Sequence, residues 1–198
     1  MRRSAWPWVI GGSILAAVAL CFQLVVADWA LRTVEAQALV ADVQTSEQVM
    51  VDTTDAFKAI IESAGSNPDD AAKAKMAADL QAECTKQAAR LRAAGQLFVD
   101  LRIAPWNRRL EIARQAYQAH NAAWQAYLDA GAVDPTSLFS SDQAAIESTW
   151  NTVKATLPEA VPVPDVLGLK KKVDTIITDG SADQSSDGSG GAGGGAAA

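Results

Sequence analysis

Few side chains in this chain of 198 residues could do chemistry. His120 is the single histidine, and a histidine that acts as a general base needs a nucleophile or an orienting carboxylate, which no motif around it supplies. A zinc site needs companion ligands at HExxH or CxxC spacing, and the sequence has neither pattern. We therefore predict no catalytic residue, no metal site and no cofactor, and we expect that the protein is not an enzyme. His120 is instead expected to be a half-buried residue of the core.

The cysteines and the adjacent acidic residues have structural explanations. Cys21 lies in an apolar segment and Cys84 on the apolar face of a predicted helix, so the two are not expected to form a disulfide. Asp69 and Asp70 follow Pro68, a position at which carboxylates stabilise the positive end of a helix dipole. Helix capping therefore explains them better than a cation site does.

A basic corner is the clearest candidate for binding. Trp106, Asn107, Arg108 and Arg109 follow Pro105, where a helix is expected to begin. Helix amides, two guanidinium groups and an indole could together hold an anion, such as a lipid headgroup, an envelope polymer or an acidic partner surface. We take these four residues as the candidate partner or anion contact. The alternative is an ordinary helix start with Trp106 buried.

Charge is unevenly distributed along the chain. Residues 28–64 carry seven acidic and two basic side chains, whereas residues 86–114 carry seven basic and two acidic ones. One interpretation is that the acidic helix packs beside the basic corner and that the charges set the pairing order. The other is that the basic corner binds a partner. The net charge of the whole chain is −6, which argues against binding to nucleic acid.

Residues 6–27 form the segment around which the chain is organised. This run of 22 residues is almost entirely apolar, and as a helix it would be roughly 33 Å long, enough to cross the core of a bilayer. Arg2 and Arg3 precede it and Asp28 follows it, so the positive-inside rule predicts a cytoplasmic N-terminus and an exported remainder. We expect a single-pass protein of the cytoplasmic (inner) membrane.

A cleaved signal peptide is the main alternative to a membrane anchor. Val25 and Ala27 form a V-x-A cleavage site, but the apolar core is longer than a signal peptide usually has. Within an anchor, Gly11, Gly12 and Ser13 make a patch of small residues that permits close approach of a second helix. We take these three residues as the candidate membrane-helix contact, the alternative being ordinary lipid-facing glycine.

The remaining chain predicts an all-α fold. Helices are expected over residues 29–64, 68–102, 105–130 and 140–157, because apolar residues recur there at helical spacing between proline and glycine breaks. The third is the most regular, with a 4–3 spacing that links Trp106, Leu110, Ala113, Tyr117, His120, Trp124 and Tyr127. The short turn after the first helix favours an antiparallel bundle of three to four helices behind a single transmembrane helix.

The predicted domain organisation follows from these elements. Residues 1–5 are the cytoplasmic N-terminus, 6–27 the transmembrane helix and 28–157 the extracytoplasmic bundle. Residues 158–179 are expected to be a linker that contains prolines and lysines, the alternative for residues 166–178 being a segment that folds transiently or docks on another surface. Residues 180–198 are expected to be a disordered tail of glycine, serine and alanine.

The sequence names no reaction and no ligand. We expect a non-catalytic bitopic protein of the bacterial cell envelope whose helical ectodomain is an interaction or accessory module for a membrane complex. Its partners would be the lipid bilayer and either a membrane protein or a second copy of the chain. The alternative is an ectodomain that senses a small molecule or an anion, because helical bundles can bind ligands between their helices.

Overall fold

A computed structural model describes residues 6–140 and 143–185, with side chains for residues 15–139 and 143–180. Every regular element in that part of the chain is helical: α1 (Trp6–Ala64), α2 (Asp70–Asp100), α3 (Arg108–Val133), α4 (Ser137–Ser140), α5 (Ala144–Thr156), the 3-10 turn η1 (Pro158–Ala160) and α6 (Leu169–Ser185). The predictions of an all-helical chain and of a long apolar helix at its N-terminus are therefore confirmed.

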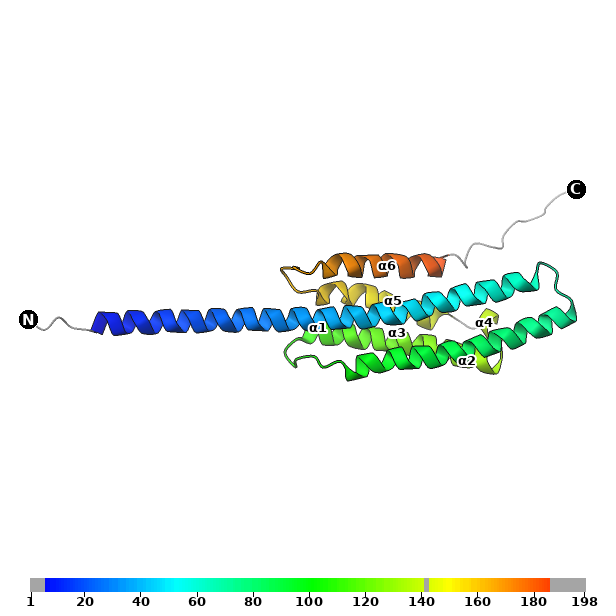
Figure 1. Cartoon of the computed structure of the whole chain (residues 1–198), viewed down its shortest axis with the longest axis horizontal. Helices are drawn as coiled ribbons and strands as arrows, with labels where there is room; N and C mark the ends of the chain where they lie inside the picture. The colour runs from blue at the N-terminus through cyan, green and yellow to red at the C-terminus, as the bar shows by residue number, and fades with distance from the viewer. Residues whose placement is uncertain (1–5, 141–142, 186–198) are drawn as a thin grey trace, which may run out of the picture.

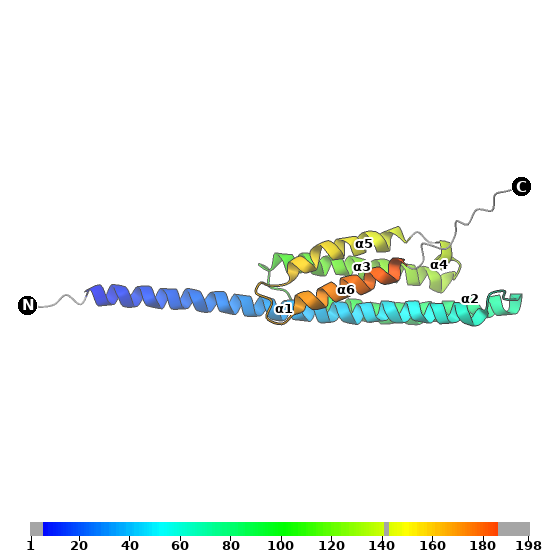
Figure 2. The same cartoon turned by 90° about the horizontal axis from the view of Figure 1, so that it is seen from above.

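The helices lie side by side along the axis of α1. The N-terminal part of α1 stands clear of the other helices, and the rest of α1, from about residue 28, packs with them (Figures 1 and 2). Successive long helices α1, α2, α3 and α5 alternate in direction, and α6 runs along α1 (Figure 1). Part of α1 is long and apolar enough to cross a membrane.

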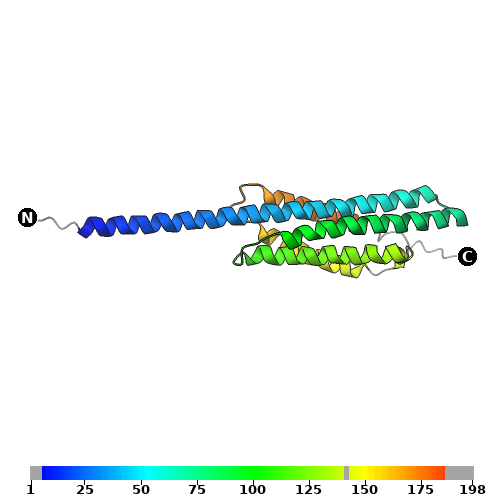
Figure 3. The same cartoon turned by 60° about the horizontal axis from the view of Figure 1, so that its bottom comes forward.

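The bundle has two ends, which we name by their position relative to the free half of α1. The proximal end consists of residues 28–35 of α1 together with residues 101–109 and 157–172, which lie at the same end in all three views (Figures 1, 2 and 3). The distal end holds the connections 65–69 and 134–140. At the distal end Gly65 turns the chain with a φ of 78°, and Asp69 caps α2 by accepting a hydrogen bond from the amide of Ala72 at 2.7 Å.

The core consists of two apolar clusters separated by buried polar side chains. The cluster nearer the proximal end is built around Phe98, Tyr117 and Trp150, and the distal one around Leu80 and Leu128. Between them Asn121, which is 2% exposed, donates to Ser46 at 2.8 Å. The helix α2 carries Gly95 here, and a Cβ at this position would lie 2.9 Å from the Asn121 Oδ1, so only glycine leaves room for the amide.

Two predicted helix starts are wrong. The third helix begins at Arg108 rather than at Pro105, because residues 104–107 form a turn in which the amide of Asn107 donates to the carbonyl of Ala104. The fourth helix, α5, begins at Ala144 rather than at Ser140, which ends the short helix α4, and Gln143 stands at the N-cap of α5 without a side-chain hydrogen bond.

The predicted linker over 158–179 is also wrong in part. Residues 169–185 form α6, which packs along α1 and buries Leu169, Val173 and Ile176 in the core. The predicted tail starts too early for the same reason, because residues 180–185 belong to α6; residues 186–198 lie outside the described part of the chain. The helical pattern of α6 is weak in the sequence. Its three buried apolar residues lie on either side of a run of lysines, and a proline-rich segment precedes them.

Candidate functional site

A buried carboxylate of α1 organises the basic corner at the proximal end. Glu35 is 7% exposed, and its two oxygens accept hydrogen bonds from the amide of Ala104 at 2.8 Å and from the Asn107 Nδ2 at 2.9 Å. A negative charge therefore already lies beside the N-terminus of α3, where the sequence suggested that an external anion would bind. Asn107 is itself buried, so its side chain contributes to the corner from within.

The indole of Trp106 projects from the turn onto the surface of α1. It is 61% exposed, and its Nε1 donates to the Asp28 Oδ1 at 2.8 Å. The other oxygen of Asp28 pairs with Arg32 one turn further along at 2.8 Å. Trp106 is therefore not a member of the buried stripe that its spacing predicted. It lies at the level of the first charged residue after the apolar segment.

The two arginines that open α3 are exposed. Arg109 lies 3.6 Å from Glu159 of η1, and both side chains remain more than two-thirds exposed, so this pair contributes little to stability. Arg108 forms no ion pair with any other residue that the structure describes. The corner thus presents Trp106, Arg108 and Arg109 outward, while Asn107 holds the turn in place.

The rest of the basic segment is used mainly within the bundle. Arg90 pairs with Asp52 of α1 at 2.7 Å, Arg92 with Asp129 of α3 at 2.8 Å, and Arg114 donates to the carbonyl of Phe98 at 2.7 Å. The predicted pairing of the acidic helix with the basic segment thus has a single ion pair, Arg90 with Asp52, among the described residues. Ion pairs alone therefore do not explain why α1 packs beside α2 and α3.

The second predicted site is the small-residue patch Gly11, Gly12 and Ser13. Its backbone belongs to α1, but its side chains lie outside those that the structure describes. The patch remains a prediction.

His120 is buried in the core rather than exposed in a site. It is 1% exposed, its Nδ1 lies 3.1 Å from the Thr149 hydroxyl, and its ring packs 5.0 Å from the ring of Trp150. Burial lowers the pKa of His120 to about 4, although a hydrogen bond with the backbone of Ile146 acts in the opposite direction. The imidazole is therefore neutral at physiological pH.

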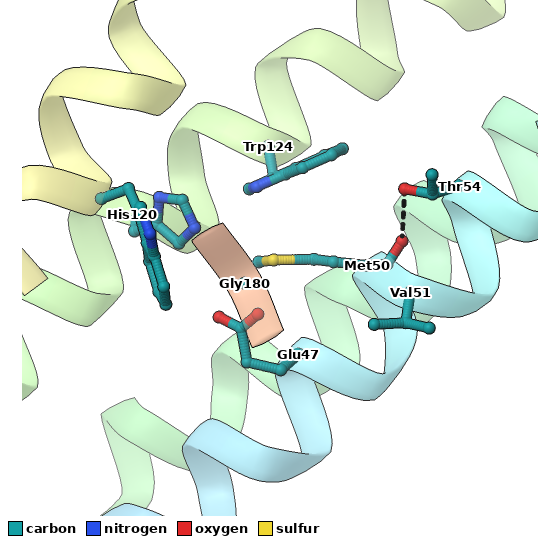
Figure 4. Close-up of a pocket in the computed structure, with 8 residues that line it drawn as sticks. Glu47, Met50, Val51, Thr54, His120, Trp124 and Gly180 are labelled. Carbon is teal, nitrogen blue, oxygen red and sulfur yellow. Dashed lines mark hydrogen bonds between the residues drawn. The ribbon is translucent and has the colours of Figure 1, made fainter. Parts of the chain in front are cut away.

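A narrow cleft lies beside His120 (Figure 4). It measures about 300 Å³ including the space open to solvent, and Glu47, Met50, Trp124 and Gly180 are among its walls. The enclosed space itself is about 20 Å³, room for about one water molecule and far below the volume of a small-molecule site. Glu47 is also engaged, because it accepts a hydrogen bond from the Tyr117 hydroxyl at 2.6 Å, and desolvation raises the pKa of that buried hydroxyl well above its usual value.

Other reactive groups are also enclosed. Cys84 is buried, and burial raises the pKa of its thiol to about 11, so the thiolate that would react is scarce at neutral pH. No group of three histidine, cysteine, aspartate or glutamate side chains within the described residues is arranged to hold a metal ion.

A face of α1 that sequence reasoning missed is left uncovered by the other helices. Its residues step by four and three along the helix, all are exposed, and none is charged; they are Ala30, Val34, Gln37, Ala41, Gln44 and Gln48, which we name the α1 stripe. The same spacing continues backward to Ala27 and Gln23 in the apolar segment, both also exposed. The signal was present in the sequence, but the neighbouring buried stripe of Val40, Val43 and Met50 has the same period and dominated the pattern.

The α1 stripe is slightly hollowed where α1 meets α2. Ala41, Gln44 and Gln48 line a shallow depression together with Arg90, and it measures about 830 Å³ including the space open to solvent. The charged residues of this part of α1 lie on other faces: Asp28 and Glu47 are bonded to α3 or the turn before it, and Glu35 is buried. Arg32 pairs with Asp28, and Asp42 is half-buried.

Comparison of the chain with protein-family models, with curated proteins and with solved structures found no match.

Proposed function

We propose that the protein is a non-catalytic, single-pass protein of the bacterial cytoplasmic membrane whose helical ectodomain is an interaction or accessory module of a membrane complex. In this proposal the N-terminus with Arg2 and Arg3 stays in the cytoplasm, residues 6–27 of α1 span the bilayer, and the bundle stands on the outer side. The charge bias across the apolar segment supports this orientation.

The observation that carries the proposal is the α1 stripe. A helix face that serves only as a solvated surface is normally rich in charge, yet this face has no charged residue from Ala30 to Gln48. The 4–3 spacing is that of a seam between two helices that wind around each other. A second helix packed along the stripe would remove Val34, which is 63% exposed, from water.

The same seam continues into the proposed membrane span. Gln23 is a polar side chain in an otherwise apolar region, and it is exposed on the stripe. A glutamine amide in lipid is satisfied best by hydrogen bonds to a neighbouring helix. A partner with both a spanning helix and a helix outside the membrane therefore fits α1 along its whole free face, and a second copy of this chain meets that description as well.

Because α1 is continuous, it would couple the membrane span to the bundle. α1 is one helix from Trp6 to Ala64, so contacts made inside the bilayer and contacts made by the bundle would share one rigid element. This suits an accessory subunit that holds the bundle at a fixed place beside a membrane complex.

The proposal is tested by mild detergent extraction of the tagged full chain from its own membranes, followed by mass spectrometry of what co-purifies. A Val34→Glu, Ala41→Glu variant places charge on the α1 stripe, and Ala122→Glu places it on an exposed position of α3 as the matched control. We expect a stoichiometric partner, or a dimer, with the wild type and the control, and its loss with the stripe variant. A chain that always purifies alone as a monomer would contradict the proposal.

A further inference from the structure

Beyond the α1 stripe, the proximal end of the bundle has a surface of its own. It faces along α1 toward the apolar segment, and the connections 101–109 and 161–168 both reach it (Figures 1 and 3). The hydrogen bond from Trp106 to Asp28 places the indole at the level where the apolar segment of α1 ends. If α1 spans the bilayer, this end of the bundle lies at the depth of the headgroups.

Apolar side chains at this end are exposed rather than packed. In the connection between η1 and α6, Val163 is 90% exposed, Val166 60% and Leu167 45%. Trp106 is 61% exposed on the other connection. Indole and aliphatic side chains of this kind are favoured at a membrane interface, where the apolar part can enter the lipid and a polar part stays hydrated.

Cations stand beside these side chains in positions that a helix normally avoids. α3 opens with Arg108 and Arg109, which Glu111 follows in the same turn, and the first turn of α6 holds Lys170, Lys171 and Lys172 with no acidic residue. A positive charge at the N-terminus of a helix opposes the helix dipole. Two helices that begin at the same end share this unfavourable feature, and such a local conflict is typical of a functional surface.

The carboxylates at this end do not neutralise the cations fully. Glu35 is bonded to Ala104 and Asn107, Asp28 to Trp106 and Arg32, and Asp165 accepts the amides of Leu169 and Lys170 at 2.9 and 2.8 Å. Glu159 lies against Arg109 at 3.6 Å, and Asp100 accepts from Gln96. Within the described residues, Arg108 and the three lysines have no carboxylate partner.

We propose that the proximal end binds the outer surface of the bilayer, with Arg108 and the α6 lysines on the headgroups of anionic phospholipids and Val163, Val166 and Trp106 among the headgroups. An anionic lipid surface offsets the helix-dipole conflict and covers the exposed apolar side chains, which neither a free anion nor bulk water does. The inference rests on the span of α1 from the proposed function. It adds that the bundle sits against the membrane instead of standing away from it.

The test uses the full chain in lipid nanodiscs, with a fluorophore on Val163→Cys in a Cys21→Ser background; the buried Cys84 remains unlabelled. Quenching by nitroxide-labelled phospholipid reports contact with the headgroups. We expect strong quenching in phosphatidylcholine discs that contain phosphatidylglycerol and weaker quenching in phosphatidylcholine alone. The matched control is Val133→Cys, which is 83% exposed at the distal end and should be unquenched in both lipids.

A charge variant separates electrostatic docking from simple proximity. Replacing Arg108, Lys170 and Lys171 by glutamine should reduce the gain in quenching from phosphatidylglycerol by about half or more, because each cation near an anionic surface contributes separately. The same change at the distal Lys58, Lys73 and Lys75 should leave it unchanged.

Several results would overturn the inference. These are an unquenched Val163 probe in both lipids, or equal quenching in both lipids that the charge variant does not change. Loss of the chain from the discs at high salt would contradict the proposed span as well. Retention in the discs with an unquenched Val163 would contradict this inference alone.

Discussion

Helices that begin at the distal end of the bundle and helices that begin at the proximal end differ in the charges of their first turns. At the distal end α2 starts with Asp70 behind the capping Asp69, and α5 has Glu147 in its first turn. At the proximal end α3 starts with two arginines followed by Glu111, and α6 has three lysines among its first four residues and no acidic residue in its first turn. The acidic residues at the distal end follow the preference of the helix dipole, and the basic residues that open the proximal helices run against it.

The difference teaches where to look for function in a chain without a catalytic motif. The distal end has a glycine turn, a capping aspartate and acidic first turns, all of which favour folding. The proximal end places cations at two helix starts and exposes apolar side chains beside them. Local departures from folding rules that recur at one end of a molecule are expected at a surface that binds something.

The largest expected effect on the free energy of unfolding comes from His120, which lies between the two ends. Its pKa is about 4 in the folded chain and near 6.5 when unfolded, so the unfolded state binds more protons between these values. The stability from His120 is fully present above about pH 6.5 and is lost as the pH falls toward 4, a change of about 3 kcal/mol. Urea unfolding of the full chain in detergent, followed by tryptophan fluorescence, measures it.

The control is His120→Gln, which has no titrating group. This variant should unfold more easily at neutral pH but show a much flatter stability over the same pH range. An unchanged pH slope in the variant would mean that His120 is not the group responsible. Because the chain has one histidine, no other imidazole can contribute to the slope.

The second prediction concerns the proximal end. Glu35→Ala removes the acceptor for the amide of Ala104 and for Asn107, and leaves both donors unpaired at a buried position. We expect a loss of about 2 kcal/mol in the free energy of unfolding. Faster hydrogen exchange over residues 101–107 should accompany it, while exchange at the distal turn stays unchanged. A loss below about 0.5 kcal/mol would show that Glu35 does not organise this end.

The third prediction concerns the helix cap at the distal end. Asp69→Ala removes the side chain that accepts from the amide of Ala72 and should cost about 1 kcal/mol. Thermal unfolding of the full chain checks this value, with Asp69→Asn as the conservative control because asparagine also caps helices well. A variant as stable as the wild type would remove the capping argument for this end.

The smallest expected effect is a gain in stability, whereas the preceding variants lose stability. Lys170→Gln and Lys171→Gln at the start of α6 should raise stability by roughly 0.3 to 1 kcal/mol each in neutral detergent, since a cation is removed from a helix N-terminus. Denaturation at low ionic strength measures this gain. A loss of stability in either variant would show that these lysines stabilise the fold and are not placed for another purpose.

Much of the fold could be predicted from the sequence, because the breaks at Gly65 and Pro68 and the apolar stripes are strong local signals. Leu110, Ala113, Tyr117 and His120 are buried as their spacing predicts. Trp106 is not, because the turn before α3 turns it onto α1. α6 was missed because its three buried positions become recognisable only when α1 is in place to receive them.

The surfaces were predicted less well than the helices. The exposure of Arg108 and Arg109 agrees with the expected basic corner, but the burial of Asn107 depends on Glu35, which lies 72 residues earlier in the chain. Such a pairing has no local signature. The α1 stripe was hidden for a different reason, since an uncovered face is defined by which helices are not packed against it.

The measurement that tests the central claim most directly is a crosslinking scan along α1 in intact membranes. A photo-reactive amino acid is placed at each position from 30 to 48 in turn, and the crosslinked products are identified by mass spectrometry. We expect crosslinks to one partner helix, or to a second copy, with maxima at Val34, Gln37, Ala41 and Gln44 and minima between them. A scan with no crosslinks, or with equal yields at all exposed positions, would contradict the claim that the α1 stripe is an interaction surface.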